Sequence, residues 1–136
     1  VLRELMYQSG VAAGEGRVLF LGWSYKAGVG DARETPTEPL ALNLIESGIS
    51  VSTWDPYLSA QDIPDGIAVI DEIGAADGFD LVVLATAHPE CMDIDWAALL
   101  SRMRTPILYD GRRVLNLEEM QAMGWKANAV GSPPRF

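Results

Sequence analysis

The sequence has very few of the residues that form disulfide bonds or bind structural metal ions. Its 136 residues include one cysteine, Cys91, and one histidine, His88. A single thiol cannot form an internal disulfide bond, and one histidine with one cysteine does not have the spacing of a structural zinc site. These absences exclude a disulfide scaffold and predict no metal site. They are typical of a protein from a reducing compartment, so we expect a cytoplasmic location.

Positive charge and long apolar runs are also scarce. Ten Lys and Arg residues stand against 19 Asp and Glu residues, which gives a net charge of −9. Such a chain repels a phosphate backbone, so we expect no nucleic-acid partner and expect any phosphate to be bound by a local group of cations. No apolar run approaches the roughly 20 residues that cross a bilayer, so no membrane partner is expected. The sequence starts at Val1, with neither methionine nor a signal-peptide pattern, which indicates a piece of a longer protein.

What is present is the composition and patterning of a folded α/β domain. Apolar residues make up 49% of the chain and charged residues 21%. Apolar runs alternate with helical patterns, which predicts a parallel sheet covered by helices. We therefore expect an α/β fold that is Rossmann-like and doubly wound, with three layers and a mostly parallel sheet of about five or six strands. The expected strands are residues 18–21, 49–54, 67–70, 79–85, 106–109 and 125–130, and the expected helices are residues 40–45, 71–76, 95–103 and 117–123.

The first of these helices has a clear start signal. Thr35 can cap it, Pro36 suits the first helical position, and Glu38 completes the spacing of a capping box. Thr37 is an alternative cap residue. In both cases the helix begins directly after the charged turn that follows the first strand.

That turn is the first candidate site. Lys26, with Arg33 further on, falls just beyond the carboxyl end of the first strand, where ligands bind in open α/β sheets and where cations can meet an anion. The turn lacks a dinucleotide fingerprint, because Gly22, Gly28 and Gly30 are not spaced as G-x-G-x-x-G. We therefore expect no NAD site of the usual kind in this domain alone. Asp55, which follows the second strand, is then interpreted as a turn residue.

Several segments in one order resemble the carboxy-terminal domain of the UDP-glucose/GDP-mannose dehydrogenases, over about residues 17–130. The segments are Gly22-Trp-Ser-Tyr-Lys26, Gly30-Asp-Ala-Arg-Glu-Thr-Pro36, Asp55-Pro-Tyr57, Ala85-Thr-Ala-His88 and Asp110-Gly-Arg112. The resemblance implies a domain that holds the UDP-sugar or a related nucleotide sugar. In that family the whole enzyme oxidises the sugar alcohol to the uronate with NAD, which is bound mainly by an amino-terminal domain.

The resemblance also implies how the chain is divided. Residues 1–16 correspond to the end of a linking helix and a connector, and residues 17–136 correspond to the UDP-sugar-binding domain. The expected partners are the amino-terminal dehydrogenase domain and, through the linking helix, further copies in a homo-oligomer. The family's catalytic cysteine and main NAD site lie in the half that this chain lacks, so the chain alone is expected to be inactive. Cys91 is interpreted as structural, and His88 as a loop or helix-cap residue.

By position, the resemblance assigns four binding residues and no catalytic one. Tyr25 and Lys26 correspond to an aromatic and a lysine at the sugar-nucleotide site, and Arg33 corresponds to an arginine that contacts NAD. Arg112 corresponds to an arginine that contacts the uridine nucleotide, and its planar guanidinium suits two-pronged recognition. Arg113 is an alternative to Arg112, since neighbouring side chains point in different directions.

Plainer interpretations of these cations stay open. Lys26 can be a solvated surface residue, and Arg33 can pair with Asp31 or Glu34 and only order the turn. At the level of the whole chain, the alternative is a free-standing Rossmann-like or flavodoxin-like module for interaction or signalling. The sequence does not distinguish UDP-glucose, a UDP-N-acetylhexosamine or GDP-mannose as the ligand.

Overall fold

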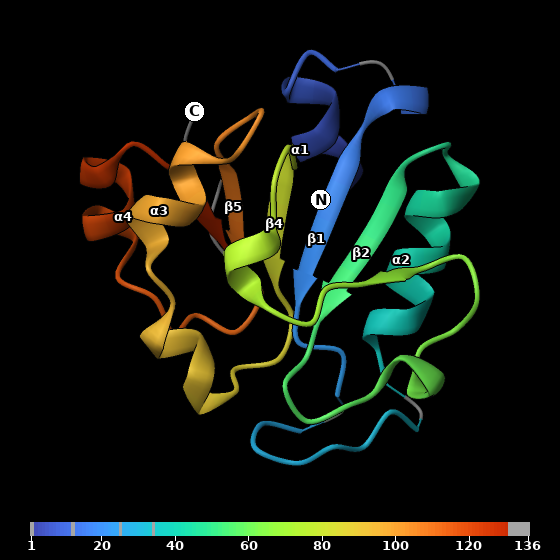
Figure 1. Ribbon diagram of the computed structural model, residues 1–136. Coiled ribbons are helices and arrows are strands. Elements are labelled where there is room, and N and C mark those ends of the chain that lie inside the picture. The colour runs from blue at the N-terminus through green and yellow to red at the C-terminus, as the bar shows by residue number, and fades with distance from the viewer. Residues whose placement is uncertain (1, 12, 25, 34, 131–136) are drawn as a thin grey trace.

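A computed structural model describes residues 2–11, 13–24, 26–33 and 35–130 of the chain (Figure 1). Tyr25, which the resemblance places at the sugar-nucleotide site, therefore lies outside the described residues. The helices are α1 (Leu2–Gln8), α2 (Thr37–Glu46), α3 (Trp96–Ser101) and α4 (Leu117–Met123), with short 3-10 turns η1 (Ala13–Glu15), η2 (Ala60–Asp62), η3 (Ile73–Ala75) and η4 (Pro89–Asp93). The strands are β1 (Arg17–Leu21), β2 (Ser50–Trp54), β3 (Ala68–Val69), β4 (Leu81–Leu84), β5 (Ile107–Asp110) and β6 (Lys126–Ala129).

The described strands form one six-stranded sheet in the order β3-β2-β1-β4-β5-β6, and each neighbouring pair is parallel. This confirms the predicted α/β, doubly wound fold. The chain moves outward from β1 in one direction and from β4 in the other, so the strand order reverses between these two central strands. Open α/β sheets bind ligands beside such a reversal, at the carboxyl ends of the strands.

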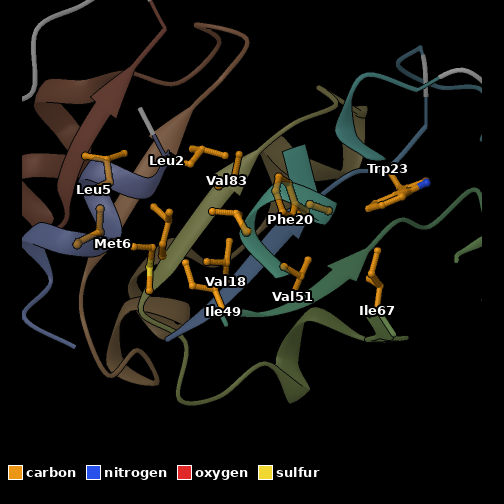
Figure 2. Packing of buried hydrophobic residues seen from close by; sticks show 14 of the residues in the cluster. Leu2, Leu5, Met6, Val18, Phe20, Trp23, Ile49, Val51, Ile67 and Val83 are labelled. Atoms are coloured by element: carbon orange, nitrogen blue, oxygen red, sulfur yellow. The ribbon is translucent and has the colours of Figure 1, made fainter. Parts of the chain in front are cut away.

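Two apolar cores lie on opposite faces of the sheet. Alternate residues of β1 point to opposite faces, so Val18 and Phe20 pack into one core and Leu19 and Leu21 into the other. Residues of α1 and α2 belong to the first core. Figure 2 shows part of this core, including Leu2 of α1 and Trp23 just after β1. Residues of α3 and α4 belong to the second, and Figure 1 shows these helices on the other side of the sheet from α2. The three-layer arrangement follows from these two buried faces.

The predicted strands and three of the four predicted helices are present, with shifted ends. The segment expected as a helix at residues 71–76 forms only the 3-10 turn η3, which has a single turn and no buried residue. The start of α2 uses Thr35, whose Oγ1 accepts a hydrogen bond from the N–H of Thr37 at 3.3 Å and donates one to the carbonyl of Trp23 at 2.6 Å. Thr35 therefore also ties the start of the helix to the loop after β1.

At the amino-terminal edge of the sheet, Asp80 organises a buried polar cluster. Its carboxylate accepts hydrogen bonds from the backbone N–H of Arg17 at 3.0 Å, from Thr105 at 2.8 Å and from the guanidinium of Arg104. Burial raises the pKa of Asp80 more than any other single cause, but the hydrogen bonds together outweigh it, so the pKa lies below its ordinary value. The ion pair of Asp80 with Arg104 fixes this edge of the sheet. The opposite edge carries the loops of the candidate site. No helix within the described ranges is both long and apolar enough to cross a membrane.

Candidate functional site

The candidate site lies where the loops after β1, β2, β4 and β5 leave the sheet. Because all these strands are parallel, their carboxyl ends share one edge. A hollow of about 460 Å³ opens at this edge. It is lined by residues of α1 and α2, of the ends of β4 and β5 and of the turn after β5, including Leu40, Leu44, Val83, Tyr109 and Arg112. Pockets for small organic ligands have volumes of about 300 to 1,000 Å³ and mostly apolar walls.

Arg3 from α1 and Arg112 both line this hollow, and Arg112 is the one at a predicted site position. Its side-chain Nε donates a hydrogen bond of 2.7 Å to the carbonyl of Ala85, just beyond β4, while its backbone N–H donates to Asp110 Oδ1 at 2.9 Å. A guanidinium carries five N–H donors, so one anchored N–H fixes the group and leaves others able to bind a ligand. Arg113, the alternative, has a left-handed backbone with φ of 56° and reaches the carbonyl of Val130 at 2.8 Å. It does not line the hollow.

Polar and steric contacts explain why Asp110 and Gly111 precede Arg112 in the turn after β5. Asp110 is fully buried, and its carboxylate accepts the backbone N–H groups of Arg112 and Leu115, which fixes the turn after β5. At Gly111 a Cβ atom would lie 2.9 Å from the carbonyl oxygen of Leu84, too close for any other residue without a shift. The turn therefore runs against the end of β4 and delivers Arg112 to the hollow.

The β1 loop (residues 22–24 and 26–30) follows β1 at the same sheet edge and carries Lys26. The side chain of Lys26 is exposed and is not among the residues that line the hollow. The structure thus brings Lys26 and Arg112 to one edge of the sheet but does not join them in one pocket. The combined cationic site predicted from the sequence remains a hypothesis.

Arg33 forms an ion pair with Asp31, which the sequence offered as an alternative to a binding role. Its Nε lies 3.1 Å from Asp31 Oδ1, and its side chain is 88% exposed. The hydrogen bond from Arg33 is the main cause that lowers the pKa of Asp31, and the same bond raises the pKa of Arg33. Exposed pairs of this kind contribute little to stability and break easily.

Asp55 is more than the turn residue that the sequence suggested. It does fix the turn after β2, where its Oδ1 accepts the N–H of Tyr57 at 2.8 Å. Its Oδ2, however, accepts four further bonds, from the N–H of Trp23, both the N–H and the hydroxyl of Ser24, and His88 Nε2. Burial is the largest influence on the pKa of Asp55 and raises it, but these hydrogen bonds together hold the pKa below its ordinary value. Asp55 therefore joins the loops that follow three different strands.

His88 occupies the predicted cap position before η4, and it also has the acid partner that the sequence did not reveal. Its ring is fully buried, with Nε2 2.9 Å from Asp55 Oδ2 and Nδ1 2.8 Å from the backbone nitrogen of Gly28. The ring of Tyr57 packs against it with centroids 4.5 Å apart. Parallel strands on either side of β1 place Asp55-Pro-Tyr57 and Thr86-Ala-His88 at the same edge, and this topological signal could have paired them.

Cys91 is a core residue. It is fully buried, and burial raises the pKa of its thiol to about 12. A thiol in this state is not an activated nucleophile, since the thiolate is the reactive form. Within the described ranges no group of His, Cys, Asp and Glu residues could hold a metal ion.

Comparisons with known proteins give a consistent picture. Residues 19–117 match the family model described as UDP-glucose/GDP-mannose dehydrogenase family, UDP binding domain. The UDP-glucose 6-dehydrogenase of Rickettsia bellii is 29% identical over 120 residues, which cover 85% of this chain and 28% of that protein. The UDP-N-acetyl-D-mannosamine dehydrogenase of Methanocaldococcus jannaschii is 31% identical over 119 residues, which cover 85% of this chain and 27% of that protein.

Solved structures agree with this match. The UDP-D-ManNAc dehydrogenase of Pyrococcus horikoshii superposes with a TM-score of 0.76 at 26% identity, over 96% of this chain and 29% of that one. An NDP-N-acetyl-D-galactosaminuronic acid dehydrogenase of Methanosarcina mazei gives a TM-score of 0.84 at 22% identity over 98% of this chain and 28% of that one, a likeness of fold. The chain spans less than a third of the length of these relatives.

Proposed function

This chain belongs to the UDP-glucose/GDP-mannose dehydrogenase family, whose UDP binding domain it forms, and from that membership we propose that it holds a UDP-sugar for an NAD-dependent dehydrogenase. The observation that carries the proposal is the position of Arg112 in a hollow at the carboxyl ends of the central strands. Family membership favours this function over the free-standing interaction or signalling module that the sequence left open.

Arg112 is proposed as the nucleotide contact. A guanidinium binds phosphate oxygens through charge-assisted bonds, often two at a time. The apolar walls around it, from Leu40, Val83 and Tyr109, suit the base and ribose rather than the phosphates. In a chain with a net charge of −9, such a local cation is needed to bind an anionic ligand at all.

Lys26, with Tyr25 before it, is proposed as a second contact to the sugar nucleotide. An exposed ammonium on a flexible stem suits a diphosphate or the carboxylate that the oxidation forms. Lys26 comes from a loop on the far side of β4 from Arg112, as the order β1-β4-β5 requires. A ligand that met both residues would cross the end of β4.

Arg33 is proposed as a contact to NAD held mainly by an amino-terminal domain. Its pairing with Asp31 is exposed, so the guanidinium can exchange that partner for a cofactor phosphate. The corresponding division of the chain is residues 1–16 as the end of a linking helix and connector, and residues 17–136 as the UDP-sugar domain. Support comes from β1, which begins at Arg17 after η1. We extend the proposal to a cytoplasmic, homo-oligomeric full-length enzyme.

Calorimetric titration of the chain with UDP tests the nucleotide site. Arg112→Ala is expected to weaken binding by about 1.5–3 kcal/mol, the usual contribution of a hydrogen bond to a charged group. Arg113→Ala is the matched control, since Arg113 is a neighbouring cation outside the hollow, and it should bind nearly as the wild type does. Equal weakening by both substitutions would indicate a nonspecific effect of positive charge on UDP binding. No weakening by Arg112→Ala would contradict the assigned contact.

A further inference from the structure

The β1 loop is held on both sides of Lys26 by buried side chains from the neighbouring loops. On the amino side, Ser24 lies two residues before Lys26 and is fully buried. Its N–H and hydroxyl donate to Asp55 Oδ2 at 2.8 and 2.7 Å, and its carbonyl accepts the hydroxyl of Thr86 at 2.7 Å. Every polar group of Ser24 is thereby fixed.

On the carboxyl side, the holding group is His88. Gly28 lies two residues after Lys26, and its N–H donates to His88 Nδ1 at 2.8 Å. Two residues further, a Cβ atom at Gly30 would lie 2.3 Å from the carbonyl oxygen of Tyr57, so the loop runs directly against the turn after β2. The segment that carries Lys26 is therefore bound to both the β2 and β4 loops, while the side chain of Lys26 is exposed.

The two contacts of His88 define its tautomer. A backbone N–H can only donate, so Nδ1 must be the unprotonated nitrogen that accepts from Gly28. The ring proton is then on Nε2, where it faces Asp55 Oδ2 at 2.9 Å. Asp55 thus orients the imidazole, in the way that a carboxylate fixes the tautomer of a catalytic or metal-binding histidine.

We propose that His88, oriented by Asp55, is a positioning residue that holds the Lys26 segment in its binding geometry through the N–H of Gly28. The role of Lys26 in this inference rests on the proposed function. His88 does not contact the ligand itself, because its ring is fully buried. Its contribution is to fix the loop before the ligand arrives, which removes the ordering cost from binding.

Two substitutions separate the contact with Gly28 from the contact with Asp55. In His88→Asn the side-chain oxygen takes roughly the place of Nδ1 and can still accept from Gly28. In His88→Gln the amide nitrogen takes roughly the place of Nε2 and can still donate to Asp55. Both variants remove the ring and its packing against Tyr57, so each controls for the other.

The first measurement needs no ligand. In the wild-type chain, hydrogen exchange at the Gly28 amide should be slow and NMR of the ring nitrogens should show the Nε2–H tautomer. The Gly28 amide should exchange about tenfold faster in His88→Gln, the effect expected for one lost hydrogen bond, and should remain protected in His88→Asn. An Nδ1–H tautomer or an unprotected Gly28 amide in the wild type overturns the proposal, even if neither variant folds.

The second measurement is the affinity for UDP-glucose, with thermal unfolding of each variant recorded beside it. His88→Gln should bind several-fold more weakly than His88→Asn, whatever the order of their melting temperatures. If affinity instead follows melting temperature, His88 is only structural and the inference is wrong. If the wild type binds neither UDP nor UDP-glucose, the proposed function fails, and the Gly28 measurement alone decides whether His88 holds the loop.

Discussion

Asp55 shows how one buried carboxylate can organise a site without facing a ligand. Its side chain is 2% exposed, and it accepts hydrogen bonds from residues that follow β1, β2 and β4. Five donors around a single carboxylate satisfy the charge that burial would otherwise make unfavourable. The loops of the candidate site therefore share one anchor.

The lowered pKa of Asp55 predicts an acid-sensitive contribution to stability. Since the pKa is lower in the folded than in the unfolded protein, the contribution is complete above the ordinary value of 3.8 and is lost as the pH falls through the folded value. Asp55→Asn should lower the free energy of unfolding at neutral pH by about 1.5–3 kcal/mol and reduce its fall in acid. Urea unfolding between neutral and acid pH measures both.

The control for this prediction is Asp31→Asn. Asp31 also has a lowered pKa, but it owes this to an exposed pair with Arg33, which water screens. Its replacement should leave the unfolding free energy at neutral pH unchanged within error. A loss as large as that from Asp55→Asn would mean that burial and hydrogen bonding do not distinguish the two carboxylates.

At the scale of single elements, the start of α2 depends on Thr35, which also bonds the loop after β1. Thr35→Ala removes the acceptor for the Thr37 N–H and the donor to the Trp23 carbonyl. Loss of an N-terminal cap costs about 0.5–2 kcal/mol, and we expect the upper part of this range because the lost bonds are buried. Chemical denaturation measures the change.

Ser47→Ala, at the other end of α2, is the matched control. The Ser47 hydroxyl makes one exposed bond of 3.3 Å to the carbonyl of Asn43, so its loss should change stability by less than about 0.5 kcal/mol. If both substitutions cost the same, Thr35 does not act as a cap.

Elements with a strong local signal could be predicted, and contacts across the chain could not. The four residues of β4 are apolar and buried, which the continuous run predicted, and the alternating pattern likewise predicted β2. The pairing of His88 with Asp55 joins residues 33 positions apart, so no local pattern shows it. The resemblance assigned Arg112 by position, but only the turn at Gly111 explains how that side chain reaches the hollow.

At the scale of the whole molecule, the chain forms the UDP binding domain of its family. The loop after β1 lacks the glycine spacing of a dinucleotide fingerprint, and Cys91 is buried with a pKa of about 12. Family membership could be predicted from several short segments in order. The placement of Lys26 outside the hollow could not, since it depends on how far each loop extends beyond the sheet.

The isolated chain should therefore bind NAD+ weakly or not at all and should not reduce it in the presence of UDP-glucose. Calorimetry and the absorbance of NADH check the two parts. Micromolar affinity for NAD+ would contradict the missing fingerprint. The proposed function predicts turnover only when an amino-terminal dehydrogenase domain is added.

The sheet separates two cores, and this has a practical use for studying the site. Met123 lies at the end of α4, is 40% exposed, and belongs to the side of the sheet opposite the helices that line the hollow. A fluorescent dye attached there through an introduced cysteine would sit apart from the nucleotide pocket, and Cys91, being buried, would not compete for the label. The two faces thus allow ligand titrations to be followed optically without altering the surface that is being titrated.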